Sequence, residues 1–150
     1  MKRIFPIFIS LIIFSLIGTK TASAQSGSKL VEMCSSSAGD DATYLKDFVV
    51  DLDAVGPDGV PKEQRYTMVL SKNTEYRFTV CNNEGSDGKA ILTLFDMSQP
   101  YVSNYSQSTG QFYKSVNFDC QKTGAYHLTI SFQDGKKGSA VAIVSFVKVL

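Results

Sequence analysis

Residues 116–132, VNFDCQKTGAYHLTISF, have the pattern of two β-strands joined by a tight turn. Apolar and polar side chains alternate on both sides of Gly124, with Phe118 on the apolar face before the turn and Leu128 on the apolar face after it. A period of two residues is typical of a strand with one buried face. Such a hairpin has to bury that face against further strands, so this stretch predicts an antiparallel β-fold.

The same alternation recurs through the chain, and residues that favour turns separate the segments. We expect strands over residues 42–52, 65–70, 75–81, 89–96, 114–120, 125–132 and 139–150, with a short additional strand over 30–33. A short helix over residues 42–48 is the alternative there. Residues 89–96 are apolar on both faces, which predicts a central place in a sheet. The pattern favours an all-β antiparallel sandwich of seven to eight strands, either jelly-roll or immunoglobulin-like.

The N-terminal segment has the three parts of an export signal. Lys2 and Arg3 form the basic part, residues 4–17 are almost continuously apolar, and Ala22-Ser23-Ala24 precedes the expected cleavage site. The apolar part is shorter than the ~20 residues of a membrane span, and an uncleaved anchor is the alternative. We expect a cleaved signal peptide (1–24), a flexible leader (25–41) and a β-sandwich domain (42–150), exported to the periplasm or the medium.

Charge excludes some classes of partner. The first 24 residues carry three of the 15 basic residues and none of the 14 acidic ones, which leaves 12 basic and 14 acidic side chains in a mature chain of 126 residues. This balance provides no electrostatic reason to bind nucleic acid or an acidic membrane surface. We expect no nucleic-acid partner and no transmembrane segment after cleavage.

Three cysteines remain after cleavage, so an oxidising compartment allows at most one intramolecular disulfide. Cys81 and Cys120 each end an expected strand at a turn, and we predict that they pair. Cys34 is then a free thiol or bonds to another chain. The strand faces disagree with this pairing, because Cys120 shares the face of Phe118 whereas Cys81 shares that of Arg77. Two reduced, separately buried thiols are therefore the alternative.

Three segments, YTMVLSKNTEYRFTVC, ILTLFD and FDCQKTGAYHLTISF, resemble the pre-peptidase C-terminal domains and related jelly-roll modules of exported bacterial proteins. The matching residues are Leu92, Leu94, Asp96, Thr123, Gly124, Tyr126 and Leu128, within residues 66–132. The resemblance implies a non-catalytic accessory or binding role, sometimes with calcium. The cysteines and a long aromatic loop depart from the family's pattern.

Gly124 and Tyr126 also have a structural interpretation. Glycine permits turn conformations that are closed to other residues. A tyrosine two residues later can bury its ring and return its hydroxyl to a loop carbonyl, as in a tyrosine corner.

His127 is the single histidine, and its position on the strand predicts that it faces solvent with Thr129 and Ser131. A Ser-His-Asp site needs a nucleophile and an orienting carboxylate beside the histidine. Asp119 and several serines are present, but no G-x-S-x-G sequence occurs. We therefore expect no catalytic residue and no zinc site.

A loose calcium site is conceivable at the carboxylates of Asp40, Asp41, Asp51, Asp53 and Asp58. The segment that begins at Asp51 departs from an EF-hand loop, because Val55 takes the third ligand position and Lys62 that of the bidentate glutamate. Solvated carboxylates are the default interpretation, and no cofactor is predicted.

Residues 97–113, MSQPYVSNYSQSTGQFY, form the longest stretch without a strand period. Tyrosine among Ser, Asn and Gly is a mixture found in binding loops. The candidate binding residues are Tyr101, Asn104, Tyr105, Phe112 and Tyr113. The alternative is that some of these rings fold back as a lid over the core.

These observations predict an exported, non-catalytic module that recognises a protein or glycan of the cell envelope through loops at one end of a β-sandwich. One alternative is a structural subunit of an envelope or secretion assembly, in one version linked through Cys34. A hydrolase that uses His127 is the other.

Overall fold

The computed structural model describes residues 22–97 and 99–150. Most of the predicted signal peptide, residues 1–21, lies outside the described residues. Within the described ranges, no helix is long and apolar enough to span a membrane.

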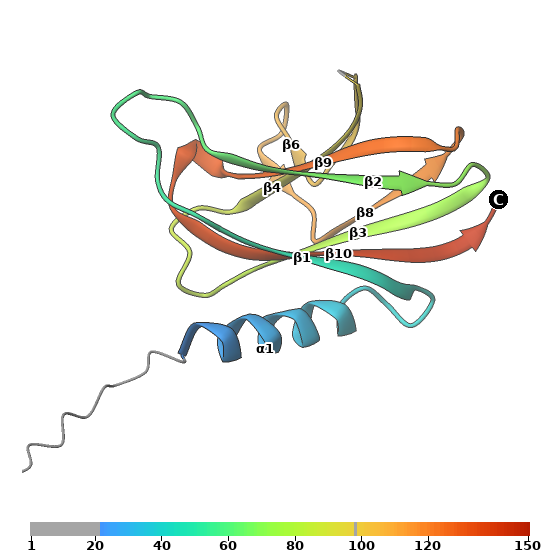
Figure 1. The fold of residues 1–150 in the computed structure, drawn as a ribbon, viewed down its shortest axis with the longest axis horizontal. Coiled ribbons are helices and arrows are strands. Elements are labelled where there is room, and N and C mark those ends of the chain that lie inside the picture. Colours follow the sequence, from blue (N-terminus) through green and yellow to red (C-terminus); the bar gives the residue numbers. More distant parts are fainter. Residues whose placement is uncertain (1–21, 98) are drawn as a thin grey trace, which may run out of the picture.

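Two four-stranded antiparallel sheets pack face to face (Figure 1). Sheet A has the order β1 (Thr43–Leu52), β10 (Gly138–Val149), β3 (Thr74–Asn82), β8 (Ser115–Cys120). Sheet B has the order β2 (Glu63–Leu70), β9 (Gly124–Phe132), β4 (Ala90–Asp96), β5 (Gln99–Ser103). A small ribbon pairs β6 (Tyr105–Ser106) with β7 (Gln111–Phe112), a helix α1 (Ala22–Ser36) precedes β1, and a 3₁₀ turn η1 (Gln133–Gly135) joins β9 to β10.

The strand order distinguishes between the two predicted layouts. Numbered along the chain, the eight strands of the sandwich follow the order 1-8-3-6 in sheet A and 2-7-4-5 in sheet B. This is the arrangement of a jelly roll, in which two interlocked Greek keys alternate between the sheets. The all-β sandwich is confirmed, and its layout is the jelly-roll alternative.

All seven long strands predicted from periodicity are present. Residues 42–48 are not helical, because β1 pairs with β10 from Thr43 opposite Phe146 to Leu52 opposite Gly138. β4 lies between β9 and β5, which confirms its central place. The eighth strand is β5, in the segment predicted to be a loop, and residues 30–33 are helical instead.

The main core fills the space between the sheets, where alternate residues of the facing strands meet. Its largest fully buried side chains are Phe78, Leu92, Leu94, Leu128, Ile130 and Val50. Gly138 lies against the ring of Phe132, and a Cβ atom built on Gly138 would come within 2.2 Å of that ring. The packing there therefore depends on the absence of a side chain.

Helix α1 forms a third layer on the outer face of sheet A (Figure 1). Leu30 and Cys34 are buried against Val141 and Ile143 of β10, in an outer cluster separate from the main core. The prediction of a flexible leader over residues 25–41 is therefore wrong where the leader forms α1. β10 is apolar on both faces because one face meets the core and the other meets this helix.

The disulfide joins Cys34 of α1 to Cys81 of β3. The predicted pairing of Cys81 with Cys120 is wrong, and so is the assignment of Cys34 as a free thiol. The strand faces explain the outcome: Cys81 points outward toward the helix, whereas Cys120 is a free cysteine buried in the main core. The strand face on which each cysteine lies thus predicts the disulfide better than the distance of each cysteine from a turn.

Tyr126 forms the expected corner, because its hydroxyl donates to the carbonyl oxygen of Lys122 at 2.8 Å. Burial raises its pKa well above the usual value for tyrosine. The expectation for Gly124 is wrong. Its φ is not positive, unlike that of Asn73 at 59°, and a Cβ atom there would meet nothing within 4 Å.

Candidate binding groove

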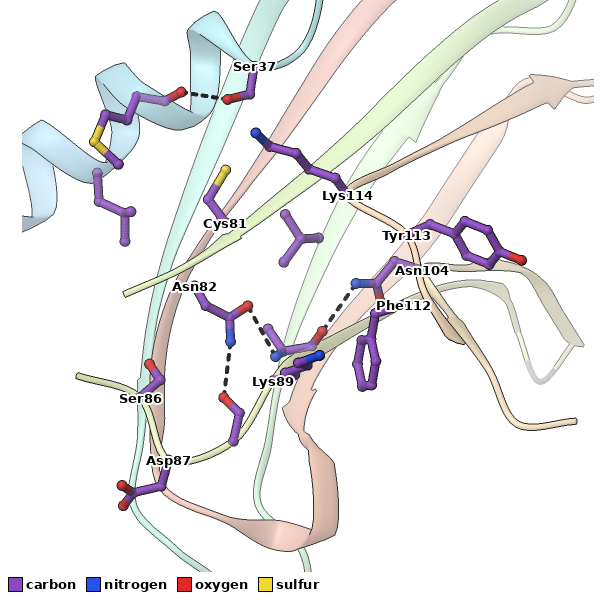
Figure 2. A pocket seen from close by; sticks show the side chains of 15 residues that line it. Ser37, Cys81, Asn82, Ser86, Asp87, Lys89, Asn104, Phe112, Tyr113 and Lys114 are labelled. Carbon is purple, nitrogen blue, oxygen red and sulfur yellow. Dashed lines mark hydrogen bonds between the residues drawn. The ribbon is translucent and has the colours of Figure 1, made fainter. Parts of the chain in front are cut away.

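A groove of about 630 Å³ lies between α1 and the segment 104–114 (Figure 2). Leu30 and Met33 of α1 form one wall, and the end of β3 forms the back. Residues 112–114 form the opposite wall. Leu30 is buried, whereas Met33 is 52% exposed, so the helix wall has an apolar base and an accessible rim.

The groove exists because β8 and β3 separate at this end of sheet A. The two strands pair from Thr74 to Thr79 of β3, and the amide of Val80 then donates to the carbonyl oxygen of Lys114 at 2.9 Å. Beyond that bond, β3 continues to Asn82 along β10, while the chain before β8 turns aside into the β6–β7 ribbon. Helix α1 roofs the space that this separation leaves.

Asn104 holds the ribbon in place. Its side-chain Oδ1 accepts from the amide of Leu92 at 2.7 Å, and its Nδ2 donates to the carbonyl oxygen of Ala90 at 3.1 Å. The residue is only 3% exposed. Because both ends of its amide group bond to the backbone of β4, Asn104, although predicted as a binding residue, has a structural role at the base of the groove.

The predicted aromatic residues divide into two groups. Tyr105 and Phe112 stack across the ribbon with ring centroids 4.5 Å apart, and the ammonium of Lys89 lies 5.2 Å from the Phe112 centroid. Tyr113 is 44% exposed, and Figure 2 shows its ring directed away from the groove. Of these three rings, that of Phe112 lies at the groove, whereas Tyr105 packs against Phe112 within the ribbon.

Tyr101 belongs to a different place. Its ring lies 5.4 Å from that of Phe118 and 5.9 Å from that of Tyr126, at the edge of the main core, and its hydroxyl donates to Asp96. Tyr101 therefore matches the alternative interpretation, a ring folded back over the core. The segment 97–113 is also more regular than predicted, since it contains β5, β6 and β7.

His127 lies half-buried on the outer face of sheet B. Its Nδ1 is 3.0 Å from the Thr67 hydroxyl, and its register neighbours are Thr67 and Phe95. The group beside the imidazole is thus a hydroxyl on one strand and an aromatic ring on the other. This arrangement does not supply the carboxylate that a catalytic triad requires.

The calcium candidates remain apart. Within the described residues, no group of three or more His, Cys, Asp or Glu side chains could hold a metal ion. Asp51 lies on β1, Asp53 follows that strand, and Asp58 accepts a hydrogen bond from the amide of Val60 in the next turn.

Asp41 instead belongs to a polar network beside the helix. Arg77 donates to both carboxylate oxygens of Asp41, at 2.6 and 2.9 Å, and to the carbonyl oxygen of Ala38 at 2.7 Å. The hydrogen bond from Arg77 lowers the pKa of Asp41. The network fixes the turn between α1 and β1.

No protein-family model matches the chain, and no curated protein sequence shows significant similarity to it. Solved structures of similar fold include the following two. One is PliG of Aeromonas hydrophila, a periplasmic lysozyme inhibitor of g-type lysozyme, with 11% identity and a TM-score of 0.50 over 69% of this chain and 87% of that chain. The other is the pre-peptidase C-terminal domain of a Bacillus anthracis collagenase, with 19% identity and a TM-score of 0.50 over 68% and 89%.

At these identities the likeness shows the fold alone. The resemblance to pre-peptidase C-terminal domains that the sequence motifs indicated is confirmed at that level, as a weak structural similarity.

Proposed function

We propose that the protein is an exported, non-catalytic binding module that recognises a protein or glycan surface through the groove between α1 and the segment 104–114. The observation that carries the proposal is the groove itself, which combines a buried apolar base with the accessible side chains of Met33 and Phe112. A concave apolar site with a few polar groups is the usual form of a binding site. In this proposal the binding site consists of the predicted loop segment together with helix α1, which forms the opposite wall of the groove.

Two further observations support this proposal. The disulfide between Cys34 and Cys81 matches an oxidising compartment, in which exported proteins fold. One protein of similar fold, PliG, is a periplasmic inhibitor of lysozyme and thus acts on another protein. The alternative in which Cys34 links two chains of an assembly is wrong, because that sulfur bonds to Cys81 of the same chain.

The test compares binding by the wild-type protein and by groove variants. The mature chain is immobilised and probed with a glycan array and with an extract of the native envelope. We expect that Phe112→Ala and Met33→Ala weaken capture of the same partner at least about tenfold, which corresponds to ~1.4 kcal/mol. Lys62→Glu, at an exposed position outside the groove, is the matched control. Capture that is equal in all four proteins would refute the groove as the binding site.

A further inference from the structure

The back of the groove is an open stretch of sheet edge. β3 is paired on one side with β10 as far as Asn82, opposite Ala140. On its other side, the pairing with β8 stops near Lys114. The groove occupies the place that the next residues of β8 would take if that strand continued.

The register shows which backbone groups face this space. In an antiparallel pair, successive residues direct their N–H and C=O groups alternately to the two sides of the strand. The amide of Val80 bonds toward β8, to Lys114, whereas the amide of Asn83 bonds toward β10, to Ser139. Asn82 therefore directs its backbone N–H and C=O groups into the groove, as Val80 does toward β8.

Apolar groups flank this edge on both sides. Val80 and Ala90 lie on the side of the main core, and Leu30 and Met33 lie on the side of the helix. An extended chain places successive side chains on opposite faces. One side chain of a bound strand would thus meet Val80 and Ala90, and the next would meet the helix.

The charged side chains that line the groove are Lys89, Lys114 and Asp87. Figure 2 shows Lys114 directed across the groove toward the end of α1, whereas Asp87 lies at the far end. Among the described residues, neither lysine takes part in a salt bridge. Lys114 and Lys89 therefore present cations at two separate places in the groove, Lys114 toward α1 and Lys89 beside Phe112.

We propose that the groove binds an extended polypeptide segment of a partner protein, which adds to β3 in line with β8 and places a carboxylate near Lys114. This proposal rests on the groove being the binding site and specifies the partner as protein rather than glycan. Strand addition draws affinity from main-chain hydrogen bonds, and side-chain pockets provide the selectivity. The backbone of Asn82 supplies the hydrogen bonds, and the apolar flanks with Lys114 supply the selectivity.

The test uses a phage-displayed library of random linear peptides, selected on the immobilised mature chain. We expect the selected peptides to share an acidic residue next to alternating apolar residues. The strongest peptide is then synthesised with a single N-methyl group at each backbone amide in turn. At the position that pairs with Asn82, methylation removes the donor, and we expect a loss of about tenfold or more in affinity.

A second arm changes the protein. Lys114→Glu weakens binding of the selected peptide about tenfold, and Lys62→Glu leaves it unchanged, because electrostatic complementarity is confined to the groove. The N-methyl series requires no protein variant, so it does not depend on the folding of a mutant.

The outcomes separate this proposal from the one on which it rests. Strand addition is overturned if N-methylation lowers the affinity at no backbone position. It is also overturned if no selected peptide binds more weakly to Lys114→Glu than to the wild-type protein. If capture of an envelope partner or glycan still falls in Met33→Ala, the groove remains a binding site for another class of ligand. If that capture also stays unchanged, both proposals fail.

Discussion

The two apolar clusters of the molecule are held together in different ways. Among the described residues, the main core between the sheets has 18 buried apolar residues, drawn from strands of both sheets. In the same part of the chain, the outer cluster between α1 and sheet A has four, Leu30, Cys34, Val141 and Ile143. The main core can close by packing alone, whereas the outer cluster is joined by a disulfide and by the bonds of Arg77 at the end of the helix.

Rough magnitudes explain the difference. Full burial of an aliphatic side chain contributes about 1.5–3 kcal/mol, so Leu30, Val141 and Ile143 together contribute several kcal/mol. The packing between α1 and sheet A is thus a small fraction of the packing between the two sheets. Packing alone therefore holds this helix poorly, and the covalent bond and the arginine bonds complete its attachment. The helix wall of the groove therefore depends on the disulfide and on the hydrogen bonds of Arg77.

Equal truncations in the two clusters should have unequal effects. Leu128→Ala, in the main core, should lower the free energy of unfolding by about 4–5 kcal/mol, and Ile143→Ala, under the helix, by about 2–3 kcal/mol. Both side chains are fully buried, but the helix can settle into the cavity more easily than two paired sheets can. Urea unfolding of both variants measures the difference, and equal losses would contradict it.

Removal of the disulfide should detach the outer cluster while the sandwich stays folded. Cys34→Ala with Cys81→Ala should cost about 2–4 kcal/mol and should raise amide hydrogen exchange in residues 27–36 far more than in β9. The single variant Cys120→Ala is the control, because Cys120 is not part of the bond. Protection of α1 that survives in the double variant would show that packing suffices.

A methyl group added to the main core should act through overpacking. Gly138→Ala brings a Cβ atom against the Phe132 ring and should cost about 1–3 kcal/mol. Gly124→Ala has open space and a φ that is not positive, so its effect should stay within about 0.5 kcal/mol. Thermal unfolding distinguishes them, and a reversed order would refute the tight contact.

The smallest effect concerns the pH dependence of the helix attachment. The hydrogen bond from Arg77 lowers the pKa of Asp41 in the folded protein below 3.8, the usual value for aspartate, so this hydrogen bond stabilises the fold fully above that pH. The contribution is lost as pH falls through the lower folded-state pKa. Asp41→Asn should therefore have a slightly lower free energy of unfolding than wild type at neutral pH. This difference in stability should become smaller below pH 3.8.

The Asp41→Asn measurement needs a control for general loss of charge. Asp40→Asn removes an exposed carboxylate next to the same turn and should leave the acid branch of the stability curve unchanged. If the difference in the free energy of unfolding between Asp41→Asn and wild type does not change with pH, the ionisation of Asp41 is not its cause, and the prediction is contradicted.

The sandwich was predictable because a period of two residues is a local signal, and it marked β1, β2, β3, β4, β8, β9 and β10. The attachment of α1 was not, since residues 25–41 show no clear period and their partners lie on the last strand. Val141 and Ile143, alternating with the core residues Ala140 and Ala142, carried a sign that β10 is covered on both faces. Read together with the outward face of Cys81, they would have favoured the correct disulfide.

The candidate groove was predictable in part. Composition pointed to Phe112 and Tyr113, which line it. Composition could not separate them from Tyr101 or from the buried Asn104, because that distinction depends on where the ribbon crosses β4. The contribution of Leu30, Met33 and the open edge of β3 is a tertiary feature with no local signal.

The packing of α1 against β10 has a consequence for the order of folding. Val141 and Ile143 lie on β10, which follows all the other strands of the two sheets along the chain and lies between β1 and β3 in sheet A. Contacts between residues distant in sequence form slowly. Helix α1, which precedes β1, therefore packs on sheet A only after β10 has joined that sheet, and the groove forms last.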